Sequence, residues 1–311
     1  MSKRSIKNIS ASVKQRLLNR AHEESRPFNE LLHYFVMERF LYRLSKSLYS
    51  GNFVLKGSLM LPVWEASLSR PTKDIDFLAR TENSIEAVMR IVKDVCEQQV
   101  VPDGIIFDSS SIKAERITEE ASYEGVRIFF IGKLETAKIT MQLDFGFGDV
   151  VIPGATEEFY PTILNFPAPV LYGYSRESTI AEKFEAMVKL GEPNSRMKDF
   201  YDIWLLSRQF NFDGSLLAEA IIKTFNTRGT NIPETPVSLT TGFAQNSRKI
   251  SQWSAFLKRN NRLSMPENLP ELIRDVAVFL GPIAEKLSVS RSFTGTWKAP
   301  GPWTLQNSLP G

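Results

Sequence analysis

The sequence predicts an α/β fold (α+β in arrangement), in which a small mixed sheet with flanking helices is followed by a helical lobe. Period-two alternation of apolar residues is concentrated between Phe53 and Phe145, whereas helical spacing dominates after Tyr174. A chain of 311 residues can bury a substantial core in one large domain or two lobes. We expect a helical extension at residues 1–50, a sheet-containing domain at 51–170, a helical lobe at 171–290 and an extended tail at 291–311.

The composition excludes several classes of protein. The net charge of +3 and the pI near 8.8 give a mild basic bias, which permits a nucleic-acid partner without arguing for one. Cys96 is the only cysteine, so an intramolecular disulfide and a cysteine-rich metal site are excluded. No apolar run approaches bilayer length and residues 1–4 form no hydrophobic signal core, so we expect a cytoplasmic protein that does not enter a membrane.

The elements along the chain follow from apolar spacing and turn residues. Two helices between residues 10 and 50 are separated near Pro27, which is tolerated at a helix start because its missing N–H needs no partner there. A buried strand at 53–55 ends at Gly57, where a helix could begin. Further helices are expected near 83–99, 180–190, 197–210, 216–225, 242–259 and 269–287, further strands at 111–117, 125–131 and 137–145, and a proline-rich crossover at 153–169.

Gly57 and Ser58 are candidate ligand-binding residues. A glycine at the end of a buried strand lets the backbone approach a ligand closely. The free N–H groups of a following helix would then face a phosphate. The Ser58 hydroxyl is a further candidate for holding a triphosphate.

Asp74 and Asp76 form a candidate metal site. In a strand, period-two alternation puts both carboxylates on one face and Ile75 and Phe77 on the other. Two adjacent carboxylates repel each other and usually need a cation, and hard oxygen ligands suit Mg²⁺. A phosphate cradle beside a metal pair is typical of phosphoryl or nucleotidyl transfer. Either half by itself is more often an ordinary turn or a solvated strand edge.

The order Gly-Ser, spacer, Asp-x-Asp resembles the nucleotidyltransferase superfamily that includes DNA polymerase beta. The AbiEii/AbiGii nucleotidyltransferase toxins of bacteria are more similar. They have a comparably long spacer and an Arg-x-Thr/Ser-x before Asp-Ile-Asp, which correspond here to Arg70, Thr72 and Lys73. The resemblance covers about residues 30–210 and implies a nucleotidyltransferase fold. The family often has Gly-Gly-Thr where this chain has Gly57, Ser58 and Leu59. Leu59 has no hydroxyl, so any phosphorylation control at the threonine of relatives does not carry over to it.

A third carboxylate would complete a two-metal site. Alternation in residues 141–145 places Asp144 on a polar face with Gln142, from which it could approach the Asp-x-Asp pair on a neighbouring strand. The alternative is an exposed aspartate at the end of the sheet. Asp149 is the fallback ligand, although the glycines around it indicate a turn.

A second set of candidate residues lies in the predicted helical lobe. The segments around Lys183 and Asp199 resemble the paired Ala-Glu-Lys and Arg-x-Lys-Asp-x-x-Asp motifs of the AbiEii toxins. Lys183 can aim its ammonium at a triphosphate while its stem packs. Asp199 would orient Lys183 or act as a base, and Arg196 suits bidentate phosphate binding. The alternatives are an inter-helix Lys183–Asp199 salt bridge and a solvated basic turn that includes Lys198. Asp202 lies three residues after Asp199 and therefore on the same face of the predicted helix.

The resemblance implies transfer of a nucleoside monophosphate from a nucleoside triphosphate (NTP) to an acceptor hydroxyl, with Mg²⁺ held by Asp74, Asp76 and Asp144. It also implies a bacterial toxin with a cognate antitoxin, and tRNA as the acceptor. Two alternatives remain on the same fold: a metal-dependent nuclease, which would cleave its substrate, and a catalytically silent protein that binds a nucleotide or a partner. The presence of Lys183 and Asp199 beside the Asp-x-Asp motif favours the enzyme.

Overall fold

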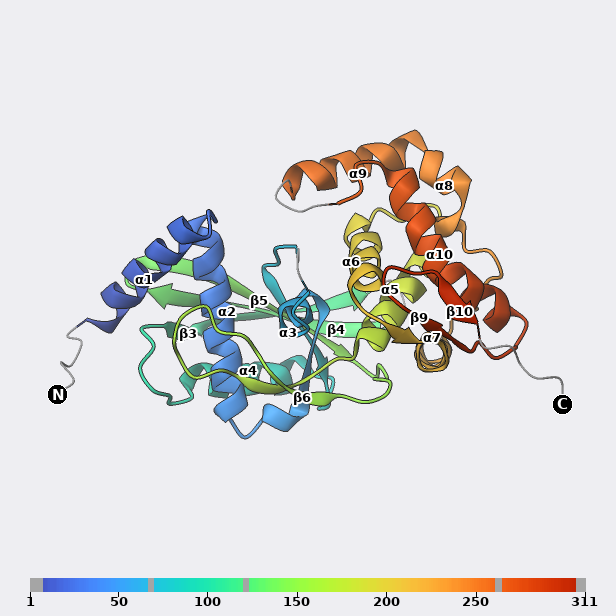
Figure 1. Ribbon diagram of the computed structural model, residues 1–311. Coiled ribbons are helices and arrows are strands. Elements are labelled where there is room, and N and C mark those ends of the chain that lie inside the picture. Colours follow the sequence, from blue (N-terminus) through green and yellow to red (C-terminus); the bar gives the residue numbers. More distant parts are fainter. Residues whose placement is uncertain (1–7, 67–69, 120–122, 261–264, 306–311) are drawn as a thin grey trace. The chain divides into compact units, whose positions relative to one another are not determined.

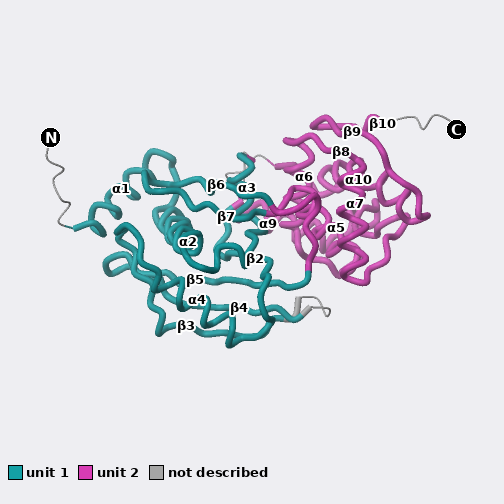
Figure 2. The backbone as a smooth tube through the Cα atoms, turned by 90° about the horizontal axis from the view of Figure 1, so that it is seen from below, with its two compact units in different colours: residues 1–65, 71–148, 156–173 teal, residues 66–70, 149–155, 174–311 magenta. Residues whose placement is uncertain are grey.

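The computed structural model describes residues 8–66, 70–119, 123–260 and 265–305. They belong to two compact units, which Figure 2 draws in different colours. The first unit comprises residues 1–65, 71–148 and 156–173, and the second comprises residues 66–70, 149–155 and 174–311. Short segments that are distant in the sequence therefore contribute to each unit.

The first unit contains a mixed sheet, as the sequence predicts. Its strands are β1 (Phe53–Lys56), β2 (Asp74–Ala79), β3 (Ile106–Glu119), β4 (Tyr123–Leu134), β5 (Ala137–Phe147), β6 (Thr156–Phe159) and β7 (Val170–Gly173). Their spatial order is β3-β4-β5-β2-β1-β7-β6. β2 runs parallel to β5, and β1 runs parallel to β7, whereas the other neighbouring pairs are antiparallel. The strands predicted at 111–117, 125–131 and 137–145 are confirmed within β3, β4 and β5.

The sheet has one apolar face and one polar face. On the apolar face the Phe77 ring stacks on that of Phe145, with ring centroids 5.5 Å apart. Helix α2 (Phe28–Lys46) packs on this face, where its Phe40 ring lies 5.3 Å from the ring of Phe130, and it crosses the strands in Figure 1. Alternation sends every second side chain to the opposite face, which carries the carboxylates predicted from the sequence.

Two further helices complete the packing of the first unit. Helix α1 (Ile9–Glu23) contacts α2, and helix α4 (Ile85–Glu97) contacts α2, β3 and β4. Ser84 caps α4 by accepting a hydrogen bond from the Ala87 N–H at 3.1 Å. The two predicted N-terminal helices are confirmed, with Pro27 immediately before the second. A 3₁₀ turn, η1 (Ser50–Asn52), leads into β1.

The helix expected after Gly57 is short. A 3₁₀ turn, η2 (Gly57–Leu59), is followed by a single α-helical turn, α3 (Met60–Val63). The chain leaves the helix at Glu65, whose φ of 57° is left-handed. So short a helix has little macrodipole, and the binding of phosphate by its N–H groups stays a prediction.

The second unit is mainly helical, as predicted. Its helices are α5 (Arg176–Leu190), α6 (Met197–Gln209), α7 (Gly214–Arg228), η3 (Val237–Leu239), α8 (Thr241–Gln245), α9 (Ser247–Arg259) and α10 (Leu269–Ser288). The helix expected at 242–259 is divided at Asn246. The Asn246 side chain accepts hydrogen bonds from the N–H groups of Arg248 and Lys249, so it caps α9 as a separate helix.

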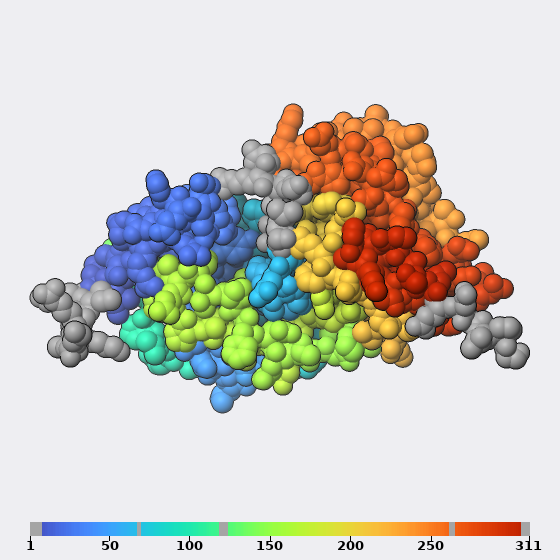
Figure 3. All heavy atoms as spheres, viewed as in Figure 1, coloured from blue at the N-terminus to red at the C-terminus, as the bar shows by residue number. Residues whose placement is uncertain are grey.

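Two strands lie among the described residues of the segment predicted as an extended tail, and they join a small sheet. Strands β8 (Phe212–Asp213), β9 (Gly295–Trp297) and β10 (Trp303–Leu305) pair in the order β10-β9-β8. Residues of β9 and β10, dark red in Figure 3, form part of the surface of the second unit. Residues 306–311 lie outside the described part of the chain. Within the described ranges, no helix combines the length and the apolar content needed to cross a membrane.

Candidate active site

Gly57 places the backbone directly against a carboxylate. Its φ is +72°, and a Cβ atom added to it would lie 2.1 Å from Asp76 Oδ2. Any side chain at this position would therefore both strain the backbone and displace Asp76. The sequence predicted a close approach of the backbone at Gly57, and the group that it approaches in this structure is the Asp76 carboxylate.

Asp74 and Asp76 project from the polar face of β2, as the alternation predicts. Ile75 and Phe77 between and after them are fully buried on the other face. The Thr72 hydroxyl donates a hydrogen bond to Asp74, and the Thr72 N–H donates to the Tyr34 hydroxyl at 2.9 Å. Thr72, which the resemblance marked as a motif position, therefore helps to hold the first carboxylate.

Asp144 supplies the third carboxylate. It lies opposite Asp76 in the parallel register of β2 and β5, and carboxylate oxygens of Asp74, Asp76 and Asp144 lie within 4.8 Å of one another. We call these three residues the acidic triad. The fallback residue, Asp149, lies in the second unit instead, where it accepts hydrogen bonds from Arg228 at 3.0 and 3.1 Å.

The acidic triad fits a divalent cation. Three like charges so close together repel one another, and a cation bound among them removes that repulsion. The donor set consists of oxygen atoms alone, which suits Mg²⁺ better than a metal that prefers nitrogen or sulfur. The residues that could hold the ion are therefore Asp74, Asp76 and Asp144.

Ser58 and Leu59 are both buried in the turn after β1. Ser58 is 6% exposed and Leu59 is 1% exposed. Leu59 therefore serves the apolar core. For Ser58, contact with a triphosphate stays a prediction.

The remaining predicted residues form an ion-pair network within the second unit. Lys183 Nζ on α5 lies 2.8 Å from Asp199 Oδ1 and 2.8 Å from Asp202 Oδ2, both on α6. Arg70 donates two hydrogen bonds of 3.0 Å to Asp202, and Arg196 Nε lies 2.9 Å from Asp199. The inter-helix Lys183–Asp199 salt bridge considered from the sequence is therefore present. It also matches the proposed orienting role of Asp199.

The members of this network are charged. Burial by itself would raise the pKa of the Asp199 carboxyl, but Lys183 and Arg196 outweigh it and lower that pKa to about 2. Likewise burial opposes ionisation of Asp202, yet Arg70 and Lys183 lower its pKa. Burial disfavours the charged form of Lys183, but Asp199 and Asp202 raise the pKa of its ammonium. The lysine is thus held cationic and in a fixed position.

The model of one protein family matches residues 39–276, and its description is Nucleotidyl transferase AbiEii toxin, Type IV TA system. The chain belongs to this family. The resemblance drawn from the motifs is confirmed, and the protein is a nucleotidyltransferase. Membership implies an NTP substrate and a cognate antitoxin.

Two solved structures, both from Helicobacter pylori, are similar to the chain. One is described as a candidate nucleotidyltransferase, with a TM-score of 0.47 and 15% identity over 84% of this chain and 95% of that one. The other is JHP933, with a TM-score of 0.46 and 15% identity over 84% of this chain and 92% of the other. No curated protein sequence matches the chain.

The AbiEii motif residues thus form two sets, one in each unit. Gly57, Ser58 and the acidic triad belong to the first unit, whereas Lys183, Asp199 and Arg196 belong to the second. Lys198, which accompanied them in the prediction, is exposed.

Sequence reasoning missed two cations beside the acidic triad. Arg127 on β4 donates hydrogen bonds of 2.7 and 2.8 Å to the two oxygens of Asp144, and Lys56 lies opposite Asp76 on β1. The signal for Arg127 was present, because a single arginine interrupts the apolar run from Val126 to Ile131. What the sequence lacked was the register that places Arg127 beside Asp144.

Proposed function

We propose that this AbiEii toxin transfers a nucleoside monophosphate from an NTP to the acceptor end of tRNA in an Mg²⁺-dependent reaction that releases pyrophosphate. The observation that carries the proposal is the acidic triad, with its oxygens within 4.8 Å and the backbone of Gly57 pressed against Asp76. Nucleotidyl transfer needs this combination, because the triphosphate and the metal must be held side by side.

Each residue of the first unit has a separate role in the proposal. Asp74, Asp76 and Asp144 would hold Mg²⁺, which when bound supplies positive charge to the phosphates and acidifies a hydroxyl. Gly57 lets the backbone lie against Asp76 without displacing that carboxylate, and the Ser58 hydroxyl would donate to a phosphate oxygen. Thr72 keeps Asp74 in the orientation required by donating a hydrogen bond to it.

The roles in the second unit follow from the AbiEii motifs. Lys183 offsets the charge that develops on the triphosphate, and Asp199 orients Lys183. The pair distance of 2.8 Å and the cationic state of the lysine support these roles. Arg196, whose side chain is 37% exposed, would contact a phosphate group, as the AbiEii motif implies.

The acceptor and the antitoxin follow from the family and from the charge of the chain. The resemblance to the AbiEii toxins implies tRNA as the acceptor, and the pI near 8.8 permits an RNA substrate. The family description places the protein in a type IV toxin–antitoxin system, so we expect a cognate antitoxin encoded in an adjacent reading frame.

The proposal is tested by incubating the purified chain with Mg²⁺, each α-labelled NTP in turn, and total RNA. We expect label to enter the tRNA band with at least one NTP, and no label to enter after chelation of the metal. Asp76→Asn should reduce incorporation on the order of a hundredfold or more, because metal-borne charge stabilisation is worth several kcal/mol. Asp108→Asn, an acid on the same sheet outside the acidic triad, is the matched control and should retain activity.

Two results would overturn the proposal. Shortened RNA fragments without added label would identify a nuclease that uses the same carboxylates. Label that enters neither RNA nor protein with any NTP would remove the proposed acceptor and the proposed reaction together.

A further inference from the structure

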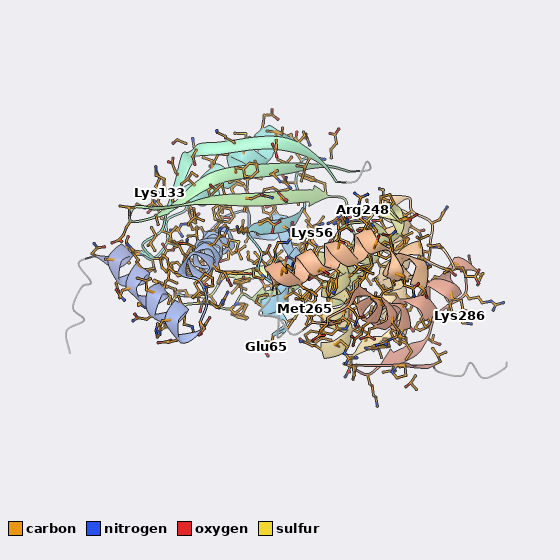
Figure 4. The ribbon with its side chains drawn as sticks, turned by 90° about the horizontal axis from the view of Figure 1, so that it is seen from above. Lys56, Glu65, Lys133, Arg248, Met265 and Lys286 are labelled. Carbon is orange, nitrogen blue, oxygen red and sulfur yellow. The ribbon has the colours of Figure 1, made fainter. Side chains whose placement is uncertain are left out.

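A row of charged residues crosses the polar face of the sheet. Reading from β3 to β1, the register places Glu115 opposite Arg127, Arg127 opposite Asp144, Asp144 opposite Asp76, and Asp76 opposite Lys56, which is labelled in Figure 4. Residues directly opposite on neighbouring strands share a face and interact. The Asp144–Asp76 pair therefore has a cation at each end, Arg127 beside Asp144 and Lys56 beside Asp76.

Both oxygens of the third carboxylate accept hydrogen bonds from neighbouring side chains. Arg127 Nε and Nη2 donate to the two oxygens of Asp144 at 2.7 and 2.8 Å, and Gln142 Nε2 lies 3.1 Å from Oδ2. Asp144 is 8% exposed, so these donors replace most of its hydration. A bidentate guanidinium–carboxylate pair is among the stronger ionic contacts in proteins, and it engages the same two oxygens from which a cation would take its ligand.

Arg127 also has a second acidic partner. Its Nη1 lies 3.9 Å from Glu115 Oε1, on the side of Arg127 away from Asp144. The Arg127 side chain is 31% exposed and that of Glu115 is 55% exposed. If Asp144 turns away to bind a metal ion, the Arg127 guanidinium can therefore stay partly neutralised by Glu115 and partly hydrated. This lowers the free-energy cost of breaking the Arg127–Asp144 pair.

We propose that Arg127 is a positioning residue that competes with the catalytic metal for Asp144 and so sets the affinity of the acidic triad for a divalent cation. The inference rests on the proposed metal site. Its physical basis is Coulomb repulsion between the guanidinium and the incoming ion, together with competition for the same oxygens. Glu115 acts in the opposite direction, because it stabilises the guanidinium when Asp144 turns to the metal.

The test is a direct titration of the full chain with Mn²⁺, without NTP, in which free Mn²⁺ is measured by electron paramagnetic resonance. Arg127→Met should lower the Mn²⁺ dissociation constant by about threefold or more, because the competing charge is gone. Glu115→Gln, an exposed change that leaves folding intact, should raise it by about twofold. Arg127→Lys keeps the charge but loses the bidentate geometry, so its Mn²⁺ dissociation constant should lie between those of wild type and Arg127→Met.

A matched control removes the same charge elsewhere on the sheet. Arg116→Met on β3 eliminates an arginine that hydrogen-bonds to Asn83 and not to the acidic triad, so it should leave the dissociation constant unchanged. If Arg116→Met tightens binding as much as Arg127→Met does, the effect is one of net charge and the proposal is overturned.

The failure of this inference can be distinguished from that of the proposed function. If wild type binds Mn²⁺, Asp74→Asn abolishes binding, and Arg127→Met weakens binding or leaves it unchanged, the metal site stands and the competition is disproved. If wild type does not bind Mn²⁺, both the metal site and the inference are overturned.

Discussion

Gly57 lacks a side chain at the point where the Asp76 carboxylate lies. The added Cβ would stand 2.1 Å from Asp76 Oδ2, and the φ of +72° disfavours any other residue. Position 57 therefore needs glycine for two reasons: the space is taken by Asp76, and the backbone is left-handed. Gly229 separates the two, because it has a φ of +64° but nothing within 4 Å of its added Cβ.

We predict that Gly57→Ala reduces nucleotidyl transfer on the order of a hundredfold, because it displaces a metal ligand by an ångström or more. Gly229→Ala should lower the free energy of unfolding by about 1 kcal/mol through backbone strain and leave the specific activity unchanged. Urea unfolding and initial rates of label incorporation check both variants. Equal activity losses in the two alanine variants would show that backbone strain, and not displacement of Asp76, limits the reaction.

The chemistry of the carboxylates could be predicted from the sequence because it depends on period-two alternation within one strand. Asp74 and Asp76 needed no knowledge of the fold to be placed on one face. Asp144 needed a guess about the neighbouring strand, and Arg127 needed the register of a third strand. Each further strand adds a choice that local sequence does not encode, which is why the flanking cations were missed.

Within helices α5 and α6, the ion-pair network makes stability depend on pH. The pKa of Asp199 is lowered to about 2 from its ordinary 3.8, because Lys183 and Arg196 outweigh the effect of burial. A carboxyl group whose folded pKa lies below its unfolded pKa adds stability above the unfolded value and loses it as pH falls through the folded value. The stabilisation by the Asp199 charge is therefore lost between about pH 4 and pH 2.

We predict that wild type exceeds Asp199→Asn in the free energy of unfolding by about 2 kcal/mol at pH 6, and that this difference shrinks as pH falls from 4 toward 2. Urea unfolding of both proteins across that range provides the measurement. A difference that stays constant with pH would mean that the Asp199 charge does not stabilise the second unit.

A buried ion pair in helix α2 makes stability depend on pH in the opposite direction, so that stability falls as the pH rises. Glu38 and Arg39 are both fully buried with 2.5 Å between their charged groups, yet Arg39 Nε and Nη1 have no hydrogen-bond partner among the described residues. Burial therefore outweighs the attraction of Arg39 and the hydrogen bond from the Ile163 N–H, and it raises the pKa of Glu38 to about 7 from 4.5.

A carboxyl group whose folded pKa is raised stabilises the fold less as pH rises from the unfolded to the folded value. We predict that the free energy of unfolding of wild type falls by about 3 kcal/mol between pH 4.5 and 7.5 through Glu38. Glu38→Gln, which imitates the protonated form, should lack this part of the pH dependence. Parallel pH profiles for the two proteins in chemical unfolding would contradict the assignment.

Most helices could be predicted because their apolar stripes and caps are local. Ser175 caps α5 by accepting a hydrogen bond from the Ser178 N–H, and Gly191 follows the last residue of the helix. The break at Asn246 was missed, since asparagine is tolerated inside a helix and its role as a cap depends on the chain direction before it. Strands β9 and β10 are three residues long and flanked by proline and glycine, so their pairing rests on tertiary contacts rather than on pattern.

At the scale of the whole molecule, the C-terminal strands contribute to the core of the second unit. The Trp297 side chain is 1% exposed, its indole N–H donates to the Ser207 carbonyl at 2.7 Å, and its ring centroid lies 4.8 Å from that of Phe279. The change of pattern after Tyr174 predicted the helical lobe but not this closing sheet.

We predict that Trp297→Ala lowers the free energy of unfolding by about 3–5 kcal/mol, as expected for a large side chain removed from a core. Leu305→Ala, at a position 53% exposed on the neighbouring strand, should change it by less than about 0.5 kcal/mol. Thermal and urea unfolding compare the two. If both changes are equally mild, the C-terminal strands do not stabilise the second unit.

The central claim is that the acidic triad drives addition of a nucleotide to an RNA acceptor. Intact-mass analysis of individual purified tRNAs, each incubated with Mg²⁺, each NTP in turn and either wild type or Asp76→Asn, tests it most directly. The account predicts a mass gain equal to one or more nucleoside monophosphates with wild type and none with Asp76→Asn. An unchanged mass with every tRNA and NTP, a loss of mass, or an equal gain with Asp76→Asn would contradict it.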